Sequence, residues 1–388
     1  MTNIKDIYSI LLREISLIVH DKNIVMMIFI APIFYAFFYG SIYINKTESD
    51  VAIAVVDMDH STTAARLIRN LDGHQLIKVN YITSNLADAK KELSNLNVSG
   101  IVYIDKDFEK NLKKGVGTTL KVYLNTTRFL VSNDLNRGIN EVVLSMGDQI
   151  KANFFRSAGY NAEQATELAQ PLNVDMRPMF NTSETYGDFL IPGIIVLILQ
   201  QTLLIGIGEA VAKERENKSL INLFKISDNN IVSTLFGKTI FYYILYCIYA
   251  LFFFSVHFYI FKIHISGNIL ELVTITSLFL LAVTFLGVFI SSFFKRKILA
   301  LQVLAFTSYP FFFLSGFSWP LHSLPASFQW LAYLIPTTPF LQAFTRVAQM
   351  GATFHHLHGE IINMLVLVAI FFTLSLIRLK VLVKEEME

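Results

Sequence analysis

The fold class is decided by one stretch, residues 298–345, which reads ILALQVLAFTSYPFFFLSGFSWPLHSLPASFQWLAYLIPTTPFLQAFT and contains no Asp, Glu, Lys or Arg. As a single helix it would be roughly 70 Å long, more than twice the roughly 30 Å of hydrocarbon in a bilayer. It is interrupted by five prolines, Pro310, Pro320, Pro325, Pro336 and Pro339. We therefore predict a membrane span that ends near Gly316, followed by a broken segment that re-enters the membrane.

Five further uncharged runs are long enough to cross a membrane as helices. They lie at residues 24–44, 189–208, 239–261, 272–294 and 361–377. Together with the first part of the stretch above they make six spans. The composition agrees, because 53% of the residues are apolar and only 16% are charged, which excludes an ordinary soluble enzyme. The predicted fold class is a polytopic α-helical membrane protein.

Positive charges near the short loops predict the orientation of the spans. They gather before the first span, between the second and third, after the fourth and after the sixth, all on one side of the membrane. The short loops of the other side carry only Lys262 and Arg346. The positive-inside rule therefore places both termini in the cytoplasm. The net charge is only +2, so the composition indicates no nucleic-acid partner.

Residues 46–188, between the first two spans, predict a folded α/β domain on the outer face. Strand-like apolar runs alternate there with helix-like stretches. Helical spacing from Phe129 to Ala158 predicts a long helix that returns the chain towards the second span. The predicted domains are an N-terminal interfacial helix (1–22), the first span (23–45), this extracytoplasmic domain (46–188) and a transmembrane domain (189–388) with a cytoplasmic coupling loop (213–238).

Two amphipathic segments lie outside the spans. Residues 4–18 predict an interfacial helix, which either anchors the first span or contacts a cytoplasmic partner. Its apolar face comprises Ile4, Ile7, Tyr8, Leu11, Ile15 and Ile18. In the coupling loop, residues 219–226 predict a short helix whose Leu220, Leu223 and Phe224 need a surface to bury against. The membrane surface and a groove on a partner both satisfy that need.

Gly237, Lys238 and Thr239 spell the end of a phosphate-binding loop. Such a loop needs another glycine five residues before Gly237, and that position is Val232. We therefore predict that the chain binds no ATP by itself. The middle of the predicted spans also contains no acidic residue to bind a coupling ion, so the energy for any transport must come from a second polypeptide.

Polar side chains in or beside the spans are the remaining candidates. Gln200 and Gln201, midway along the second span, either line a substrate path or hydrogen-bond between packed helices. His257 is expected at the membrane interface. Three further histidines lack a carboxylate partner at fixed spacing, so we predict no metal site and no catalytic residue. They are His355, His356 and His358.

Several short motifs, in order along the chain, resemble those of one family. They are Arg13, Glu14, His20, Asp21 and Pro32; VVDMDHS at 55–61; Arg215, Glu216 and Ser219; Gly237 and Lys238; and Ser315, Gly316 and the prolines Pro320, Pro325, Pro336 and Pro339. The combination resembles the permease subunits of type 2 ABC exporters, in the subgroup with a large outer domain after the first span. Lys218 and Ile221 depart from the glycine and glutamate usual in that family. Within VVDMDHS, Asp59 or Ser61 can cap the helix that follows.

The resemblance implies a half-transporter of the bacterial inner membrane. A second permease, identical or paralogous, would complete the path, and separate ATPase subunits would bind ATP and Mg²⁺ and dock on the coupling region. By resemblance, that region comprises Glu214, Arg215, Glu216, Ser219, Leu220, Leu223 and Phe224. In many relatives the cargo is a drug-like or lipid-like amphiphile. The outer domain would shape the exit or meet a periplasmic adaptor.

The competing interpretation is a membrane receptor or scaffold that uses the same fold without transport. A neighbouring gene for a lone ATPase subunit favours export, and its absence favours the receptor or scaffold. Membrane lipid is a partner in either case, because the spans are apolar along their length.

Overall fold

The computed structural model describes residues 4–44, 48–172, 176–182 and 184–387. The chain divides into two compact units. We call Met1–Lys46 with Pro178–Glu388 the helical unit, and Thr47–Arg177 the α/β unit. The predicted junction between the first span and the outer domain, at residues 45 and 46, lies outside the described residues.

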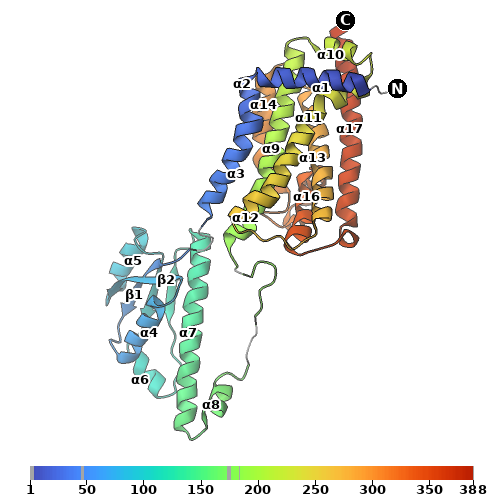
Figure 1. Ribbon diagram of the computed structural model, residues 1–388. Coiled ribbons are helices and arrows are strands. Elements are labelled where there is room, and N and C mark those ends of the chain that lie inside the picture. Colours follow the sequence, from blue (N-terminus) through green and yellow to red (C-terminus); the bar gives the residue numbers. More distant parts are fainter. Residues whose placement is uncertain (1–3, 45–47, 173–175, 183, 388) are drawn as a thin grey trace. The chain divides into compact units, whose positions relative to one another are not determined.

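Six helices of the helical unit are long and apolar enough to cross a membrane (Figure 1). They are Lys22–Ile42 (α2 Lys22–Val25, η1 Met26–Ile30 and α3 Ala31–Ile42), Tyr186–Glu216 (α9), Ile231–Ile260 (α11 Ile231–Phe252, η2 Phe253–His257 and α12 Phe258–Ile260), Ile269–Ser291 (α13), Lys297–Leu314 (α14) and His358–Met387 (α17). Helix α9 is central, since it packs against α3, α11, α13 and α14 and buries most of its apolar stretch. Helices α14 and α17 leave most of theirs exposed, as lipid contact requires.

The second and third spans are longer than predicted. The second continues as one helix to Glu216 instead of ending at residue 208, and the third begins at Ile231 instead of residue 239. The predicted coupling loop at 213–238 is therefore mostly helical, and it includes the short helix α10 (Leu220–Ile226). The helices run on because their terminal charged side chains are paired inside the bundle, as described below.

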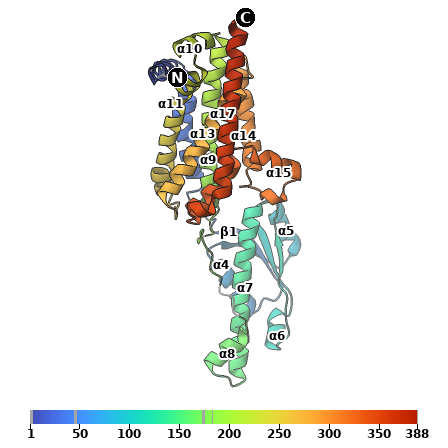
Figure 2. The same ribbon diagram turned by 90° about the vertical axis from the view of Figure 1, so that its right-hand side faces the viewer.

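The broken segment after α14 folds into short helices. They are η3 (Leu321–Ser323), α15 (Ala326–Tyr333), α16 (Thr337–Phe344), η4 (Thr345–Gln349) and η5 (Phe354–His356). Pro325 and Pro336 occupy the N-caps of α15 and α16, where a missing N–H is harmless. Helix α16 is buried in the bundle, with the ring of Phe340 stacked 4.1 Å from that of Phe279 on α13. Helix α15 stands away from the bundle (Figure 2). Whether this segment re-enters the membrane stays a prediction.

The N-terminal helix α1 (Ile4–Val19) lies crosswise over the ends of the long helices (Figure 1). It packs on α11, where Gly237 permits close approach, since a Cβ there would lie 2.6 Å from Cβ of Ile10. The buried residues of α1 are Ile10, Glu14 and Ile18. The predicted apolar face is therefore rotated from the packed one: Ile4 is 81% exposed, and a glutamate lies in the packed stripe. The apolar periodicity could not reveal this, because both faces of α1 carry isoleucines.

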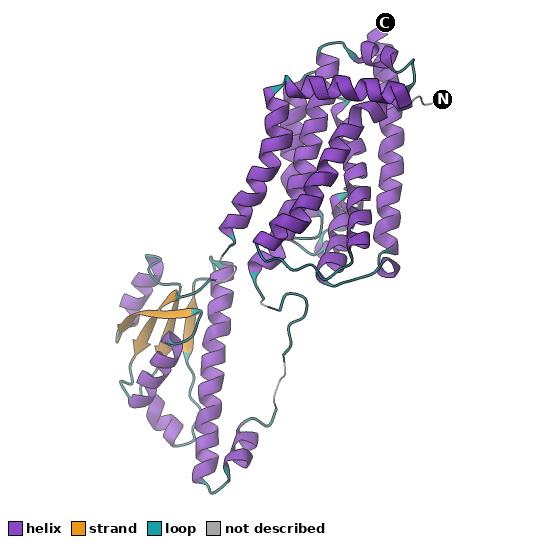
Figure 3. Cartoon of the chain, in the orientation of Figure 1, coloured by secondary structure: helices purple, strands orange, loops and turns teal. Residues whose placement is uncertain are grey.

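The α/β unit contains a four-stranded sheet in the order β2-β1-β3-β4 (Figure 3). Strands β1 (Val51–Asp57), β2 (Ile77–Thr83) and β3 (Gly100–Ile104) are parallel, and β4 (Lys121–Leu124) is antiparallel to β3. The helices are α4 (Thr62–Asp72), α5 (Leu86–Ser94), α6 (Phe108–Lys113), α7 (Phe129–Ser157) and α8 (Ala162–Ala169). Helices α4 and α7 pack on one face of the sheet and α5 on the other. The strands and helices follow the predicted alternation, while the side of the membrane stays a prediction.

Helix α4 begins with a side-chain cap and a tie to α6. Oγ of Ser61 accepts a hydrogen bond from N of Ala64 at 3.1 Å, so Ser61 is the cap. The hydroxyls of Thr63 and Thr62 donate to Oε1 of Glu109 at 2.6 and 2.9 Å. These two bonds, with Lys113 nearby, lower the pKa of Glu109 to about 2.

Candidate functional site

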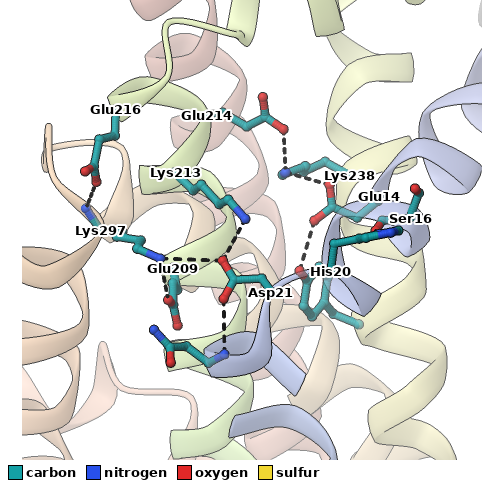
Figure 4. Close-up of polar contacts among 12 residues, drawn as sticks. Glu14, Ser16, His20, Asp21, Glu209, Lys213, Glu214, Glu216, Lys238 and Lys297 are labelled. Carbon is teal, nitrogen blue, oxygen red and sulfur yellow. Dashed lines mark hydrogen bonds and ion pairs between the residues drawn. The ribbon is translucent and has the colours of Figure 1, made fainter. Parts of the chain in front are cut away.

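The last two turns of α9 carry charged side chains into the bundle, where they meet charges from α1, from the N-cap of α2, and from α11 and α14 (Figure 4). We call this set the charge cluster. It comprises Arg13, Glu14, Asp21, Glu209, Lys213, Glu214, Lys238 and Lys297. The four positive charges balance the four carboxylates, so the cluster as a whole does not attract a further ion by net charge.

One half of the cluster ties α1 to α9 and α11. The guanidinium of Arg13 donates to both carboxylate oxygens of Glu214, at 2.7 and 3.0 Å. The ammonium of Lys238 lies between two carboxylates, 2.6 Å from Oε2 of Glu14 and 3.0 Å from Oε1 of Glu214. The hydroxyl of Tyr242 donates to Glu14 at 2.9 Å. Because Glu14, Glu214 and Lys238 are buried, each depends on these partners in place of water.

The other half ties the start of the first span to α9 and α14. Oδ1 of Asp21 caps α2 by accepting from N of Asn23 at 3.1 Å, and Oδ2 accepts from Nζ of Lys213 at 2.6 Å. Nζ of Lys297 lies 3.5 Å from Asp21 and 3.6 Å from the buried carboxylate of Glu209. Partial burial raises the pKa of Asp21, but the hydrogen bond from Lys213 and the two lysine charges outweigh it, so the net shift is downward.

The predicted polar coupling residues connect helices to one another. Glu214 belongs to the cluster, and the hydroxyl of Ser219 donates to its carboxylate. Nη1 of Arg215 donates to the carbonyl of Ser292, where α13 ends, at 2.5 Å. Oε2 of Glu216 accepts from N of Lys297 at 2.8 Å and so caps α14. These contacts link the end of α9 to the helices around it, whereas their predicted role towards an ATPase stays a prediction.

Two of the predicted apolar contacts of α10 are already made within the chain. Leu220 and Leu223 are each 2% exposed and face Val211, Val288 and Leu379. The expectation that these two leucines bury against an ATPase therefore needs correction, because α10 uses them to attach itself to the bundle. Phe224 is half-buried. The side of α10 that remains open comprises Asn222, Lys225 and Ile226.

The two glutamines of the second span lie between packed helices. The hydroxyl of Thr337, at the start of α16, donates to Oε1 of the fully buried Gln200. Nε2 of Gln201 donates to the carbonyl of Leu304 on α14 at 2.5 Å. Both contacts are thus those of helix packing, and the alternative role in a substrate path stays a prediction.

The histidines of the helical unit have different surroundings. His257 is fully buried among the rings of Phe37 and Phe253, and its Nε2 lies 2.9 Å from the carbonyl of Ala36 on α3. Its depth at the membrane interface stays a prediction. It is hidden because α11 continues through η2 into α12 and turns His257 towards α3. Within the described part of the chain, no group of three His, Cys, Asp or Glu side chains is arranged to hold a metal.

The sequence motifs included Arg13, Glu14, Asp21, Glu214 and Lys238, but they did not predict that these charges meet inside the bundle, because charged residues were expected at the ends of spans. Glu209 and Lys238 fall just outside the predicted limits of 208 and 239, yet both lie within helices. Glu209 is buried in the last two turns of α9, so it does not bear on the prediction that the middle of the spans contains no acidic residue. The sequence did contain one signal that Glu14 is buried. Glu14 is spaced four residues from both Ile10 and Ile18, so the three side chains lie on one face of the helix.

Comparison with known proteins agrees with this architecture. Over residues 22–377 the chain matches the family described as ABC-2 family transporter protein. It is 24% identical over 346 residues, 87% of each chain, to a probable multidrug ABC transporter permease, YbhS, of Escherichia coli (strain K12). It is 20% identical over 391 residues, 98% of each chain, to the inner membrane transport permease YhhJ of the same strain. It also shares 29% identity over 113 residues, 29% of this chain and 28% of the other, with the linearmycin resistance permease protein LnrN of Bacillus subtilis (strain 168).

The family match begins at the first residue of α2 and ends in α17, so it includes all six apolar helices and the α/β unit. The match also includes α10 and the members of the charge cluster on α9, α11 and α14, whereas Arg13, Glu14 and Asp21 precede it. The chain therefore belongs to the ABC-2 family of transporter proteins.

Proposed function

We propose that this chain is the permease subunit of an ATP-driven exporter, which moves an amphiphilic or drug-like substrate outward across a bacterial inner membrane. Family membership implies an ATPase partner and, commonly, a dimeric assembly. The ATPase would bind ATP and Mg²⁺, since this chain has Val232 where a phosphate loop needs glycine. The multidrug and resistance permeases among its relatives support an amphiphilic cargo.

The observation that carries the proposal is the attachment of α10. Its apolar side is buried in the bundle, while Lys225 and Ile226 stay exposed at the end where α9, α11 and α17 meet. Movement of α10 would pass to α9 through Ser219 and Glu214, and from Glu214 to α1 and α11. Because buried ion pairs tolerate little separation, these helices would move together when ATPase subunits close and reopen.

We also propose a topology for this chain and the partners other than the ATPase. Both termini would be cytoplasmic, the α/β unit extracytoplasmic and the segment after α14 re-entrant. A second copy or a paralogue would complete the path, and the outer unit would shape the exit or meet a periplasmic adaptor. The charge asymmetry of the short loops supports this orientation.

The test compares two changes on opposite sides of α10. Ile226→Asp alters a side chain that is 39% exposed, so the chain should insert and fold normally but lose ATPase association and export. Leu223→Asp places a charge in the bundle and should prevent folding. Val381→Asp on α17, at a position that is also 39% exposed, is the matched control. Co-purification of an ATPase at wild-type strength with the folded Ile226→Asp variant would refute the coupling role of α10.

A further inference from the structure

A cavity of about 350 Å³ lies at the end of the helical unit where α9 and α17 begin. The part of α9 from Phe189 to Glu209 separates this end from the charge cluster by roughly 30 Å, about the thickness of the hydrocarbon of a bilayer. Its wall has an apolar part with Phe189, Phe317 and Leu341, and a polar part with Gln342, Arg346 and Glu360. The volume is at the lower end of the range for small-molecule sites, roughly 300–1,000 Å³, and suits one polar headgroup.

The polar wall carries one positive and one negative charge side by side. Nη1 of Arg346, in the π-helical turn η4, donates to Oε1 of Glu360 at 2.9 Å and to the carbonyl of His356 at 2.9 Å. The Arg346 side chain is 48% exposed, whereas that of Glu360 is only 13% exposed. Among the described residues, both contacts of Arg346 use Nη1, so the other guanidinium nitrogens are turned to neither partner. They can donate two parallel hydrogen bonds to a phosphate.

The apolar wall is aromatic and held in place by a glycine. The rings of Phe189 and Phe317 stack face to face, with centroids 5.0 Å apart and planes 3° apart. Phe317 reaches this position because Gly193 on α9 has no side chain, and a Cβ there would collide with the Phe317 ring. Phe189 is 41% exposed, so one face of this pair is open to a ligand. An aromatic face attracts a cationic ammonium group.

A ligand with a single charge fits this wall poorly. An anion attracted by Arg346 would also meet the carboxylate of Glu360, and a cation attracted by Glu360 would meet the guanidinium. A zwitterion satisfies both charges at once. We propose that the cavity binds the zwitterionic headgroup of an amphiphile, with its phosphate on Arg346 and its ammonium between Glu360 and the Phe189 ring. This inference rests on the proposed export function, because that function makes the cavity a place where an outward-moving amphiphile is held.

The test measures headgroup preference with the purified full chain in an uncharged detergent. Phosphatidylethanolamine and phosphatidylglycerol with identical acyl chains are titrated, and bound lipid is counted by native mass spectrometry. We expect the wild type to prefer phosphatidylethanolamine by roughly tenfold, the effect of one hydrogen-bonded charge. Glu360→Gln should reverse the preference in favour of phosphatidylglycerol, and Arg346→Gln should weaken the binding of both lipids. His355→Gln, an exposed neighbour that does not line the cavity, should change nothing.

A charge-swapped variant separates loss of the site from misfolding of the single variants. Arg346→Glu combined with Glu360→Arg keeps an ion pair in the wall, so it should keep the preference for phosphatidylethanolamine. A wild-type chain that binds the two lipids equally, or a Glu360→Gln variant that keeps the wild-type preference, would overturn the site.

The headgroup could belong to an exported amphiphile or to a resident lipid of the membrane. A single-chain zwitterionic amphiphile, an alkylphosphocholine, distinguishes these two sources. Binding of this probe together with phosphatidylethanolamine indicates an exported amphiphile, and binding of the two-chain lipid alone indicates a resident lipid; failure of both removes the site. The assay uses neither ATP nor an ATPase. Loss of export with headgroup preference intact would therefore refute the proposed function alone, and the reverse result would refute only the site.

Discussion

Removing the ammonium of Lys238 should destabilise the helical unit more than any other single charge removal in the cluster. In Lys238→Met, Glu214 keeps its two hydrogen bonds from Arg13, but Glu14 keeps only that from Tyr242 among the described contacts. Glu14 is 1% exposed, so its charge would be buried without a counter-charge at hydrogen-bond distance. Stranding one partner of a buried ion pair costs about 3–5 kcal/mol, and we expect a loss of this size.

The pair of Lys238 and Glu14 allows a second, stricter prediction. Adding Glu14→Gln removes the stranded charge while leaving a group that can accept from Tyr242, so the double variant should recover at least about half of the loss. The free energy of unfolding would be measured by circular dichroism in mixed micelles with increasing dodecyl sulfate. Lys295→Met, which removes an exposed lysine near the start of α14, is the control and should cost little. A Lys238→Met loss no larger than the control, or a double variant as unstable as the sum of its parts, would contradict the account of the cluster.

Three further predictions address the α/β unit, the topology and the packing of α1 on α11. The lowered pKa of Glu109 means that its hydrogen bonds stabilise the fold above pH 4.5 and cease to do so as the pH falls towards about 2; thermal unfolding should show this loss, and Glu109→Gln should abolish it. Cysteines at the exposed positions Ser84 and Asn229, in a cysteine-free background, should react with an impermeant reagent from outside and inside respectively, and labelling of both from outside would refute the six-span topology. Gly237→Val should displace Ile10, because a Cβ at position 237 would lie 2.6 Å from Cβ of Ile10, so limited proteolysis should release α1 from the folded bundle. Gly147→Val, on an open surface of α7, should release nothing.

The features that the sequence predicts well are those that follow from apolar patterning. Six apolar helices and the order of strands and helices in the α/β unit need only the contrast between water and a dry interior. Helix limits fail where a charge is paired instead of solvated, as at Lys238, because a single sequence does not say which charges meet. The prediction of the packed face of α1 is wrong for the same reason. Glu14 is expected in solvent unless its partner Lys238, 224 positions along the chain, is known.

In the proposed exporter, the paired charges would let the permease respond to a separate ATPase. The single side chain of Glu214 contacts three helices: α1 through Arg13, α11 through Lys238 and the start of α10 through Ser219. Charges buried in this way have no water to replace a lost partner, so separating any one contact costs several kcal/mol, whereas moving all the helices together costs none of it. Under the proposed function, a force applied to α10 would therefore reach α9 as a movement of its whole end. Since α9 contacts α3, α13 and α14, the displacement would continue into the rest of the bundle.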